Sequence, residues 1–259
     1  MARFTPAELE QRVLDGLPHE LELFGTSAES SRVDRVGEVI ASIVPAAPDR
    51  SLMNSIYAPD PADLAGAIEE LEEVYERASV RASLVWLPGG DELGPALLEQ
   101  RGYVHDGSPR SMGLDLRDLR EPARSVPDGV TVLGGEIREA AAINDRAYGY
   151  SRPSWAAALK RPPRVPISWA VAVWDGEPVA CAAAISSEDG DAQITCVATV
   201  PERRGHGLAG RLVHSLLVKA RDGGAVTGTL QASRAGAPVY ERLGFRDVGH
   251  LDLWEKRTP

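Results

Sequence analysis

A glycine-rich stretch late in the chain, VPERRGHGLAGRL at residues 200–212, combines three glycines with three arginines. An apolar, β-branched run precedes it and a helical apolar pattern follows it. The first backbone N–H groups of a helix have no partner within the helix, and the helix dipole makes that end positive. Glycine lets a ligand approach the backbone closely. The stretch therefore predicts a phosphate or pyrophosphate site; a surface loop with solvated arginines is the other interpretation.

Two common phosphate-binding motifs do not fit this loop. A P-loop needs Lys and then Ser or Thr after its glycines, whereas Gly210 is followed by Arg211 and Leu212. The dinucleotide fingerprint GxGxxG is matched only loosely from Gly205 to Gly210, late in the chain and without the β-α-β setting that it requires.

A second segment, SRAGAPVYERLGF at residues 233–245, follows the loop. Together the two segments resemble the GCN5-related N-acetyltransferases (GNAT superfamily). Arg204-x-x-Gly207-x-Ala209 is similar to motif A of that family, [QR]-x-x-G-x-[GA]. The second segment is similar to the family's N-x-x-A-x-x-L-Y-x-x-x-G-F, with Tyr240 at the tyrosine. Ser233 and Gly236 stand where the family often has Asn and Ala. The resemblance covers about residues 128–259.

The resemblance implies a way of binding acetyl-CoA as co-substrate, with no metal. The strand before motif A is expected to separate from its neighbour, so that its backbone holds the pantetheine arm while the loop amides hold the pyrophosphate. The coenzyme-binding residues implied in this way are Val197, Ala198, Thr199, Arg203, Arg204, Gly205, His206, Gly207, Leu208, Ala209, Gly210, Ser233 and Tyr240.

The resemblance also implies direct attack of an amine on the thioester, with a backbone amide polarising the carbonyl oxygen. Tyr240 aligns with the tyrosine that protonates the leaving thiolate. Gln193 falls where several family members carry a catalytic Glu, and Gln cannot accept a proton at neutral pH. Asp191 is the candidate base acting through water; the other candidates are Glu188, Asp189 and Asp145. We expect His206 to support the coenzyme and His214 to be structural.

Hydrophobic periodicity predicts the elements that position these residues. Residues 175–177, Asp-Gly-Glu, indicate a hairpin between two strands, and Gly223-Gly224 ends the helix after the loop. The expected strands are 130–133, 168–174, 178–185, 192–200, 225–231 and 246–254, with helices at 136–148, 155–160, 208–220 and 238–243. This order predicts an α/β domain with a mixed, mostly antiparallel, twisted sheet flanked by helices.

The first half of the chain resembles a second copy of the same pattern. Residues 116–128 are polar, contain two prolines and predict a linker. Shifting the sequence by 142 residues places Gly94 on Gly236, Glu99 on Glu241 and Gly102 on Gly244, which indicates an internal repeat. We therefore expect two tandem GNAT-like domains, residues 1–120 and 129–259, joined by 121–128. The first half is expected to be helical within 5–31 and 61–78, with strands at 36–44, 52–58 and 82–87.

The chemical residues do not recur in the first half. Ala62 falls where Arg204 stands, Ala65 where Gly207 stands, and Leu98 where Tyr240 stands. Asp60 and Asp63 add negative charge where an anionic coenzyme would bind. Residues 1–120 are therefore expected to be a degenerate domain without a coenzyme motif, which packs against the catalytic half and walls the acceptor cleft.

Composition excludes several classes of protein. The net charge is −10, and all the excess acid lies in residues 1–127, which argues against nucleic-acid binding. No apolar run is long enough to span a bilayer. The first ten residues, MARFTPAELE, are acidic and lack an apolar signal region, so we expect no signal peptide. Cys181 and Cys196, the only cysteines, are expected to be buried thiols. We expect a cytoplasmic protein without nucleic-acid or membrane partners. A homodimer is one possible oligomeric state.

The acceptor predicted from these features is a primary amine of a small molecule. It would lie between the 148–166 loop and the sheet, where the aromatic candidates are Tyr148, Tyr150, Trp155 and Trp169. Two alternatives remain at this point. The acceptor could be the N-terminus of a protein or peptide, or the chain could be a non-catalytic acyl-CoA-binding regulator.

Overall fold

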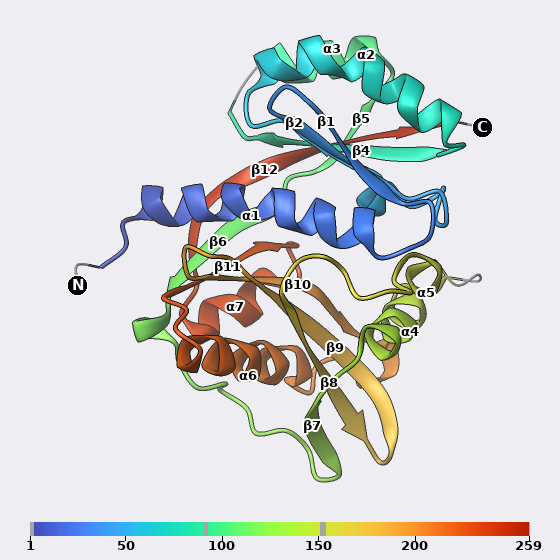
Figure 1. Cartoon of the computed structure of the whole chain (residues 1–259). Helices are drawn as coiled ribbons and strands as arrows, with labels where there is room; N and C mark the ends of the chain where they lie inside the picture. Colours follow the sequence, from blue (N-terminus) through green and yellow to red (C-terminus); the bar gives the residue numbers. More distant parts are fainter. Residues whose placement is uncertain (1–2, 91–92, 151–153, 259) are drawn as a thin grey trace. The chain divides into compact units, whose positions relative to one another are not determined.

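The computed structural model describes residues 3–90, 93–150 and 154–258, and it divides the chain into two compact units (Figure 1). Unit 1 consists of Met1–Gly16, Arg110–Ala156 and Val165–Val248. Unit 2 consists of Leu17–Pro109, Ala157–Arg164 and Gly249–Pro259. The units therefore interleave along the chain, whereas the sequence predicts the consecutive halves 1–120 and 129–259.

Unit 1 is built on a mixed, mostly antiparallel sheet in the order β7-β8-β9-β10-β11-β6. Only β10 and β11 run parallel. The strands are β7 (Val130–Gly134), β8 (Ile167–Trp174), β9 (Glu177–Ser186), β10 (Asp191–Thr199), β11 (Thr227–Ala232) and β6 (Arg110–Asp115). The predicted α/β class is confirmed, and so is the hairpin of β8 and β9, where Asp175 and Gly176 both have positive φ.

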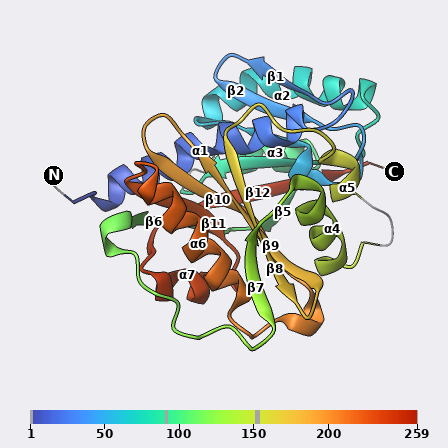
Figure 2. The ribbon, with the colours of Figure 1, turned by 60° about the horizontal axis from the view of Figure 1, so that its bottom comes forward.

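Helices cover both faces of this sheet (Figure 2). Side chains alternate between the faces along a strand. Ala170, Ala172, Ala180, Ala182 and Ala184 therefore pack in the core that includes α6 (Leu208–Asp222) and α7 (Ala237–Leu243). Val171 and Cys181, on the opposite face, pack with α4 (Ile137–Ala147). The short helix α5 (Trp155–Ala158) follows α4 in the chain. Alanine on β8 and β9 lets α6 approach the sheet closely.

The parallel pair β10 and β11 separates part-way along its length. Pairing runs only from Asp191 to Gln193 on β10, opposite Thr227 to Thr229 on β11. On its other side β10 carries a bulge between Thr195 and Ala198, where the register with β9 shifts. Cys196 within the bulge has φ 54, a conformation that residues with a Cβ rarely adopt. The later part of β10 is thus turned away from β11, as the sequence predicts.

The last strand of each unit comes from an unexpected part of the chain. The sequence places residues 246–254 in the sheet of the second half, whereas the structure divides them: residues 246–248 belong to unit 1 and residues 249–254 to unit 2. Strand β12 (Arg246–Arg257) pairs antiparallel with β4 (Ala82–Pro88) and also with β5 (Val104–Gly107). Strand β11 is completed instead by β6. The partners are set by tertiary packing: Trp254 lies in the core of unit 2, and Met112 and Leu114 lie in the core of unit 1.

The sheet of unit 2 has the order β1-β2-β3-β4-β12. Its further strands are β1 (Arg32–Val36), β2 (Val39–Ile43) and β3 (Ser55–Tyr57). Helix α2 (Pro61–Arg77) buries one face against this sheet, and α3 (Leu93–Gln100) packs beside it. The strand expected at 36–44 corresponds to β2, and Gly37 with φ 59 lies in the turn that joins it to β1 in a hairpin. Of the strand expected at 52–58, Ser55–Tyr57 forms β3, whereas Leu52 and Met53 belong to a 3-10 turn.

A single helix, α1 (Pro6–Thr26), spans the predicted helical region near the N-terminus. Thr5 and Glu8 form a reciprocal cap: the Thr5 backbone N–H donates to the Glu8 carboxylate at 2.7 Å, and the Glu8 N–H donates to Thr5 Oγ1 at 3.2 Å. No helix in the part of the chain that the structure describes is long and apolar enough to cross a membrane.

Within unit 1, a buried carboxylate joins β10 to β11 and lies close to α1. Asp191 Oδ1 accepts from Thr227 Oγ1 at 2.6 Å, and its Oδ2 accepts from Thr229 Oγ1 at 2.5 Å. Arg12 of α1 donates to Thr227 Oγ1 at 3.2 Å and pairs with Asp189 at 2.8 Å. Burial raises the pKa of Asp191, and the two threonine hydrogen bonds oppose that effect only in part.

We expect Asp191 to give the stability of the chain a pH dependence. Because its pKa is raised in the folded state, the folded chain holds this proton more tightly than the unfolded chain does. The contribution of Asp191 to the free energy of unfolding therefore falls as pH rises from the ordinary value of 3.8 through the folded-state pKa. Asp191→Asn removes the ionisation, so its melting temperature should decline less than that of the wild type over the same pH range.

The control for this measurement is Asp222→Asn, which alters an exposed carboxylate at the end of α6. Its melting curve should follow that of the wild type at each pH. Parallel pH profiles for the wild type and Asp191→Asn would contradict the assigned role of Asp191.

Candidate active site

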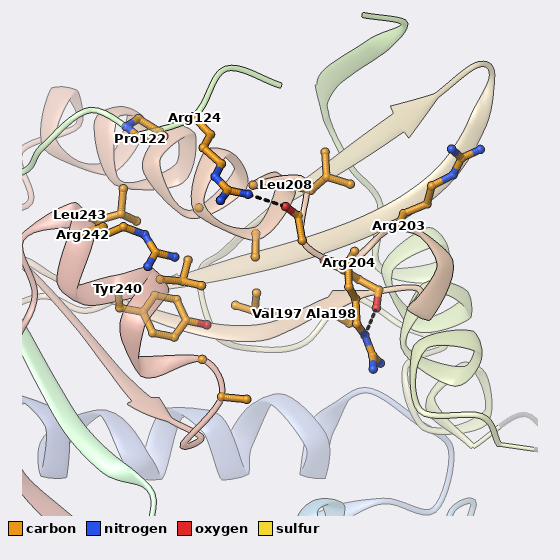
Figure 3. A pocket seen from close by; sticks show the side chains of 18 of the residues that line it. Pro122, Arg124, Val197, Ala198, Arg203, Arg204, Leu208, Tyr240, Arg242 and Leu243 are labelled. Atoms are coloured by element: carbon orange, nitrogen blue, oxygen red, sulfur yellow. Dashed lines mark hydrogen bonds between the residues drawn. The ribbon is translucent and has the colours of Figure 1, made fainter. Parts of the chain in front are cut away.

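A pocket of about 550 Å³ opens in unit 1 where β10 has left β11 (Figure 3). The end of β10, the loop after it, the start of α6, and α7 form most of its walls. The end of α4 and residues 122–124 complete the lining. A pocket of this size is within the range that binds small molecules and cofactors.

The glycine-rich loop has the conformation that a phosphate cradle needs. Gly205 and Gly207 have φ 81 and φ 77, and Gly207 is the N-cap of α6. Because left-handed backbone favours glycine, other residues would strain the turn here. The loop therefore presents the first amides of α6 to the pocket, at the positive end of the helix dipole.

Arg204 braces this loop from within. Its Nε donates to the Thr199 carbonyl oxygen at 3.1 Å, and its Nη2 donates to the Ala147 carbonyl oxygen at 2.7 Å. One guanidinium thus ties the loop to the end of β10 and to the end of α4. The motif arginine therefore sets the position of the amides as well as adding charge.

The pocket is strongly cationic. Four of its lining residues are arginines, and no Asp or Glu is among them; the arginines are Arg124, Arg203, Arg204 and Arg242. The Arg203 guanidinium stacks over the Trp174 ring at 4.2 Å from the centroid. A polyanionic ligand would meet positive charge without carboxylate competition.

Tyr240 lies on the wall formed by α7, and its hydroxyl points toward β10 near Val197 and Ala198 (Figure 3). Its ring is buried and packs edge-on against Phe245, with centroids 6.0 Å apart. Burial, and to a lesser extent the nearby Tyr148, raises the pKa of Tyr240 well above its usual value. The hydroxyl is therefore a proton donor throughout the neutral range.

The two departures from the family pattern have a local explanation. Ser233 Oγ accepts from the Gly236 backbone N–H at 3.1 Å, so serine caps the turn that leads into α7. A Cβ on Gly236 would lie 3.2 Å from Ser233 Oγ and 3.3 Å from Tyr240 Cε2. Glycine at 236 thus leaves room for the serine and the tyrosine ring together.

The structure brings the sequence-predicted coenzyme residues together with one exception. All of them except His206 line the pocket. His206 instead packs edge-on against Trp174, with ring centroids 4.9 Å apart. His214 is buried on α6, and its Nε2 lies 3.4 Å from a Glu121 oxygen. Burial lowers the pKa of His214, which favours a neutral, structural imidazole.

The residues considered as proton acceptors lie outside the pocket lining. Gln193 is buried on β10, and a Cβ on Gly16 of α1 would lie 2.9 Å from its Cδ. Asp191 is held by its two threonines. Asp145 accepts hydrogen bonds from the backbone N–H groups of Ser154, Trp155 and Ala156, so it caps α5. A base role for Asp191 or Gln193 stays a prediction, and the structure adds no contact in its favour.

One of the four predicted acceptor aromatics reaches the pocket. Tyr148 lines it and remains 55% exposed. Its ring stacks on Tyr150 and Trp155, with centroids 5.9 Å and 6.4 Å apart. Trp155 is buried, and Trp169 packs against the core beside α4. Residues 151–153 of the predicted acceptor loop lie outside the described residues.

Sequence reasoning missed part of the pocket. Residues 122–124, interpreted as linker, form one wall, and α7 contributes further residues between and after the motif positions. The lining residues not predicted are Pro122, Ala123, Arg124, Ala147, Ala235, Gly236, Val239, Arg242 and Leu243. Arg124 lies in a proline-flanked segment without a motif, and Arg242 stands two residues after Tyr240 at a position where the second motif specifies no residue.

The later part of the chain is similar to a known protein family. Residues 136–245 match the model of the Acetyltransferase (GNAT) family. No curated protein sequence matches the chain. Among solved structures, a GCN5-related N-acetyltransferase from Kribbella flavida is similar to the chain with a TM-score of 0.68 and 20% identity, covering 97% of this chain and 96% of that one.

Two further structures are similar in fold. A GCN5-related N-acetyltransferase from Sphaerobacter thermophilus has a TM-score of 0.58 and 20% identity, over 85% of this chain and 76% of that one. A tandem GNAT protein from the clavulanic acid biosynthesis pathway has a TM-score of 0.54 and 14% identity, over 96% of each chain. Both motifs and most of the pocket lie within the matched segment. The chain therefore carries, over residues 136–245, an acyltransferase domain of the acetyltransferase (GNAT) family.

Proposed function

We propose that the chain transfers an acetyl group from acetyl-CoA to a primary amine of a small molecule, by direct attack in a ternary complex. The observation that carries this proposal is the joint placement of the glycine-rich loop, the separated end of β10 and Tyr240 on one cationic pocket. Acetyl-CoA would supply the activated thioester, and the family uses it as co-substrate.

The residues present fit the pyrophosphate, the pantetheine arm and the thioester of this coenzyme. The amides of residues 205–210 would bind the pyrophosphate at the start of α6. The backbone of Val197 to Thr199, which has no pairing with β11, would hold the amide-containing pantetheine arm. Tyr240, on the facing wall, would then lie beside the thioester.

The chemistry needs two proton movements and one polarised oxygen. A neutral amine attacks the thioester carbonyl, while a backbone N–H of β10 stabilises the negative charge on the oxygen. As the carbon–sulfur bond breaks, the Tyr240 hydroxyl gives its proton to the sulfur. The proton lost by the amine goes to water, because Asp191 and Gln193 do not line the pocket.

The same proposal assigns the first half of the sequence to a degenerate domain. Under the 142-residue shift α2 falls on α6, β4 on β11 and α3 on α7. At the start of α2, Pro61 lacks an N–H, and the Asp60 carboxylate accepts from the Ala62 N–H at 2.8 Å. A carboxylate thus takes the place that the loop of α6 leaves for phosphate. The tandem solved structure similar to this chain supports the same interpretation.

We expect Tyr240→Phe to lower kcat by about 10²-fold or more, because it removes the proton donor to the thiolate. The Kd for acetyl-CoA, measured by calorimetry, should stay within about twofold because the ring still packs on Phe245. The assay is thiol release from acetyl-CoA with a panel of primary amines. Since the pKa of Tyr240 is raised, wild-type kcat should show no loss from tyrosine ionisation below pH about 10.

An alkaline loss of wild-type kcat below that pH which Tyr240→Phe abolishes would contradict this role. If no amine accelerates thiol release while acetyl-CoA raises the melting temperature, the chain is a binding module rather than an enzyme. Acceleration by a peptide N-terminus, and by no small amine, would favour the alternative acceptor.

Arg204→Ala should raise the Kd for acetyl-CoA about tenfold or more, because the loop loses both of its ties to the backbone. Arg204→Lys keeps the charge but lacks the fork that reaches two carbonyls, so it should resemble Arg204→Ala. Arg246→Ala, a charge change on an exposed residue outside the pocket, is the control. A wild-type Kd in Arg204→Lys would show that charge alone matters.

Calorimetry should give one acetyl-CoA per chain. Ala62→Arg should leave this stoichiometry unchanged, because Asp60 still occupies the first amide of α2. Two molecules of acetyl-CoA per wild-type chain would overturn the degenerate assignment.

A further inference from the structure

Two arginines of the pocket stand at positions that the family motifs do not specify. Arg124 comes from the segment at residues 120–124, which the sequence predicts as linker. Arg242 comes from the last turn of α7. Figure 3 shows both guanidinium groups reaching toward the pocket from the side of Pro122 and Leu243, with Arg203 at the opposite end.

Hydrogen bonds hold the segment 120–124 to other parts of unit 1 at both of its ends. The Arg120 backbone N–H donates to the Leu243 carbonyl oxygen at 2.9 Å, next to Arg242. Arg124 Nη1 donates to the Gly205 carbonyl oxygen at 2.9 Å, and a Cβ on Gly207 would lie 3.5 Å from Arg124 Cβ. The segment therefore reaches from the end of α7 to the phosphate loop.

Glu121, which lies in the chain between Arg120 and Arg124, makes two further contacts with α6. Glu121 lies 3.4 Å from His214 Nε2 and 3.9 Å from Arg211 Nη1, both on α6. The wall that carries Arg124 is thus held to α6 as well as to α7. Its cation is fixed in place relative to the loop.

These two arginines retain donors for a ligand. A guanidinium has five N–H donors. Arg204 directs its bonds to two backbone carbonyls, and Arg203 lies over Trp174. Arg124 uses one donor on Gly205, and Arg242 has no hydrogen-bond or ion-pair partner among the described residues. No carboxylate lines the pocket to compete for them.

The proposed co-substrate offers an anion that the loop does not account for. Its pyrophosphate requires the amides of one helix start, and its ribose carries a separate 3′-phosphate. A phosphomonoester has about two negative charges at neutral pH and three acceptor oxygens. Arginine forks match such a group better than backbone amides alone do.

We propose that Arg124 and Arg242 form a subsite for the 3′-phosphate of coenzyme A, separate from the pyrophosphate loop. This inference rests on the proposed function. It makes the chain selective for thioesters of coenzyme A over those of 3′-dephospho-coenzyme A. The segment 120–124 is then a part of the coenzyme site.

The test is calorimetry with two ligands, acetyl-CoA and acetyl-3′-dephospho-CoA. Wild type should bind acetyl-CoA about tenfold or more tightly than the dephospho ligand. Arg124→Ala and Arg242→Ala should each weaken acetyl-CoA several-fold while changing the dephospho ligand much less. The double variant should bind both ligands with nearly equal Kd. Arg246→Ala, which changes an exposed charge outside the pocket, should preserve the wild-type ratio.

Each other outcome counts against the subsite. Equal wild-type affinity for both ligands overturns it and leaves the proposed function standing. Equal weakening of both ligands by the variants assigns the arginines to the loop or pyrophosphate instead, and also overturns it. Absence of acetyl-CoA binding to folded wild type would remove the proposed function and the subsite together. Circular dichroism and melting curves verify that the variants, which change exposed side chains, remain folded.

Discussion

The separation of β10 from β11 after Gln193 is the constraint on which the pocket depends. While two parallel strands stay paired, their backbone N–H and C=O groups are hydrogen-bonded to each other and cannot bind a ligand. Side chains then fill the space between the covering helices. Here the pairing stops after three residues, and the bulge at Cys196 turns the strand away. Three features follow from the separation of the two strands: the pocket, the backbone of 197–199 that is not paired with β11, and the approach of α7 to the opening.

Arg204 keeps that opening in one shape. Its two bonds tie the loop to Thr199, five residues earlier, and to Ala147, 57 residues earlier, and both acceptors are backbone carbonyl oxygens. A guanidinium that donates to two backbone carbonyls is well suited to holding a loop whose glycines would otherwise be free to move. The remaining pocket arginines can then act on a ligand rather than on the protein.

Much of this could be predicted from the sequence, where local chemistry decides the structure. The strands of unit 1 from β7 to β11, their hairpin and the two motif helices follow from periodicity, turn residues and caps, because these signals are local. Strand partners could not be predicted, because the pairing of β6 and β12 depends on cores that are assembled from distant segments. Arg124 was missed for a related reason: its role depends on docking of residues 120–124, and a proline-flanked polar stretch is typical of a linker. The positions of Gln193 and Asp145 likewise follow from packing against α1 and α5, which spacing along one strand or helix does not reveal.

The partner of β4 has a consequence for how the chain is made. Strand β4, ASLVWLP, is almost fully buried and pairs on one edge with β3 and on the other with β12. Synthesis runs from the N-terminus, so more than 150 residues leave the ribosome after β4 before its second partner exists. Until then this apolar strand is paired on one edge only, and an unpaired apolar edge is the kind that recruits strands from other chains. The order in which the strands are synthesised therefore makes the nascent chain, rather than the finished protein, the form most exposed to aggregation.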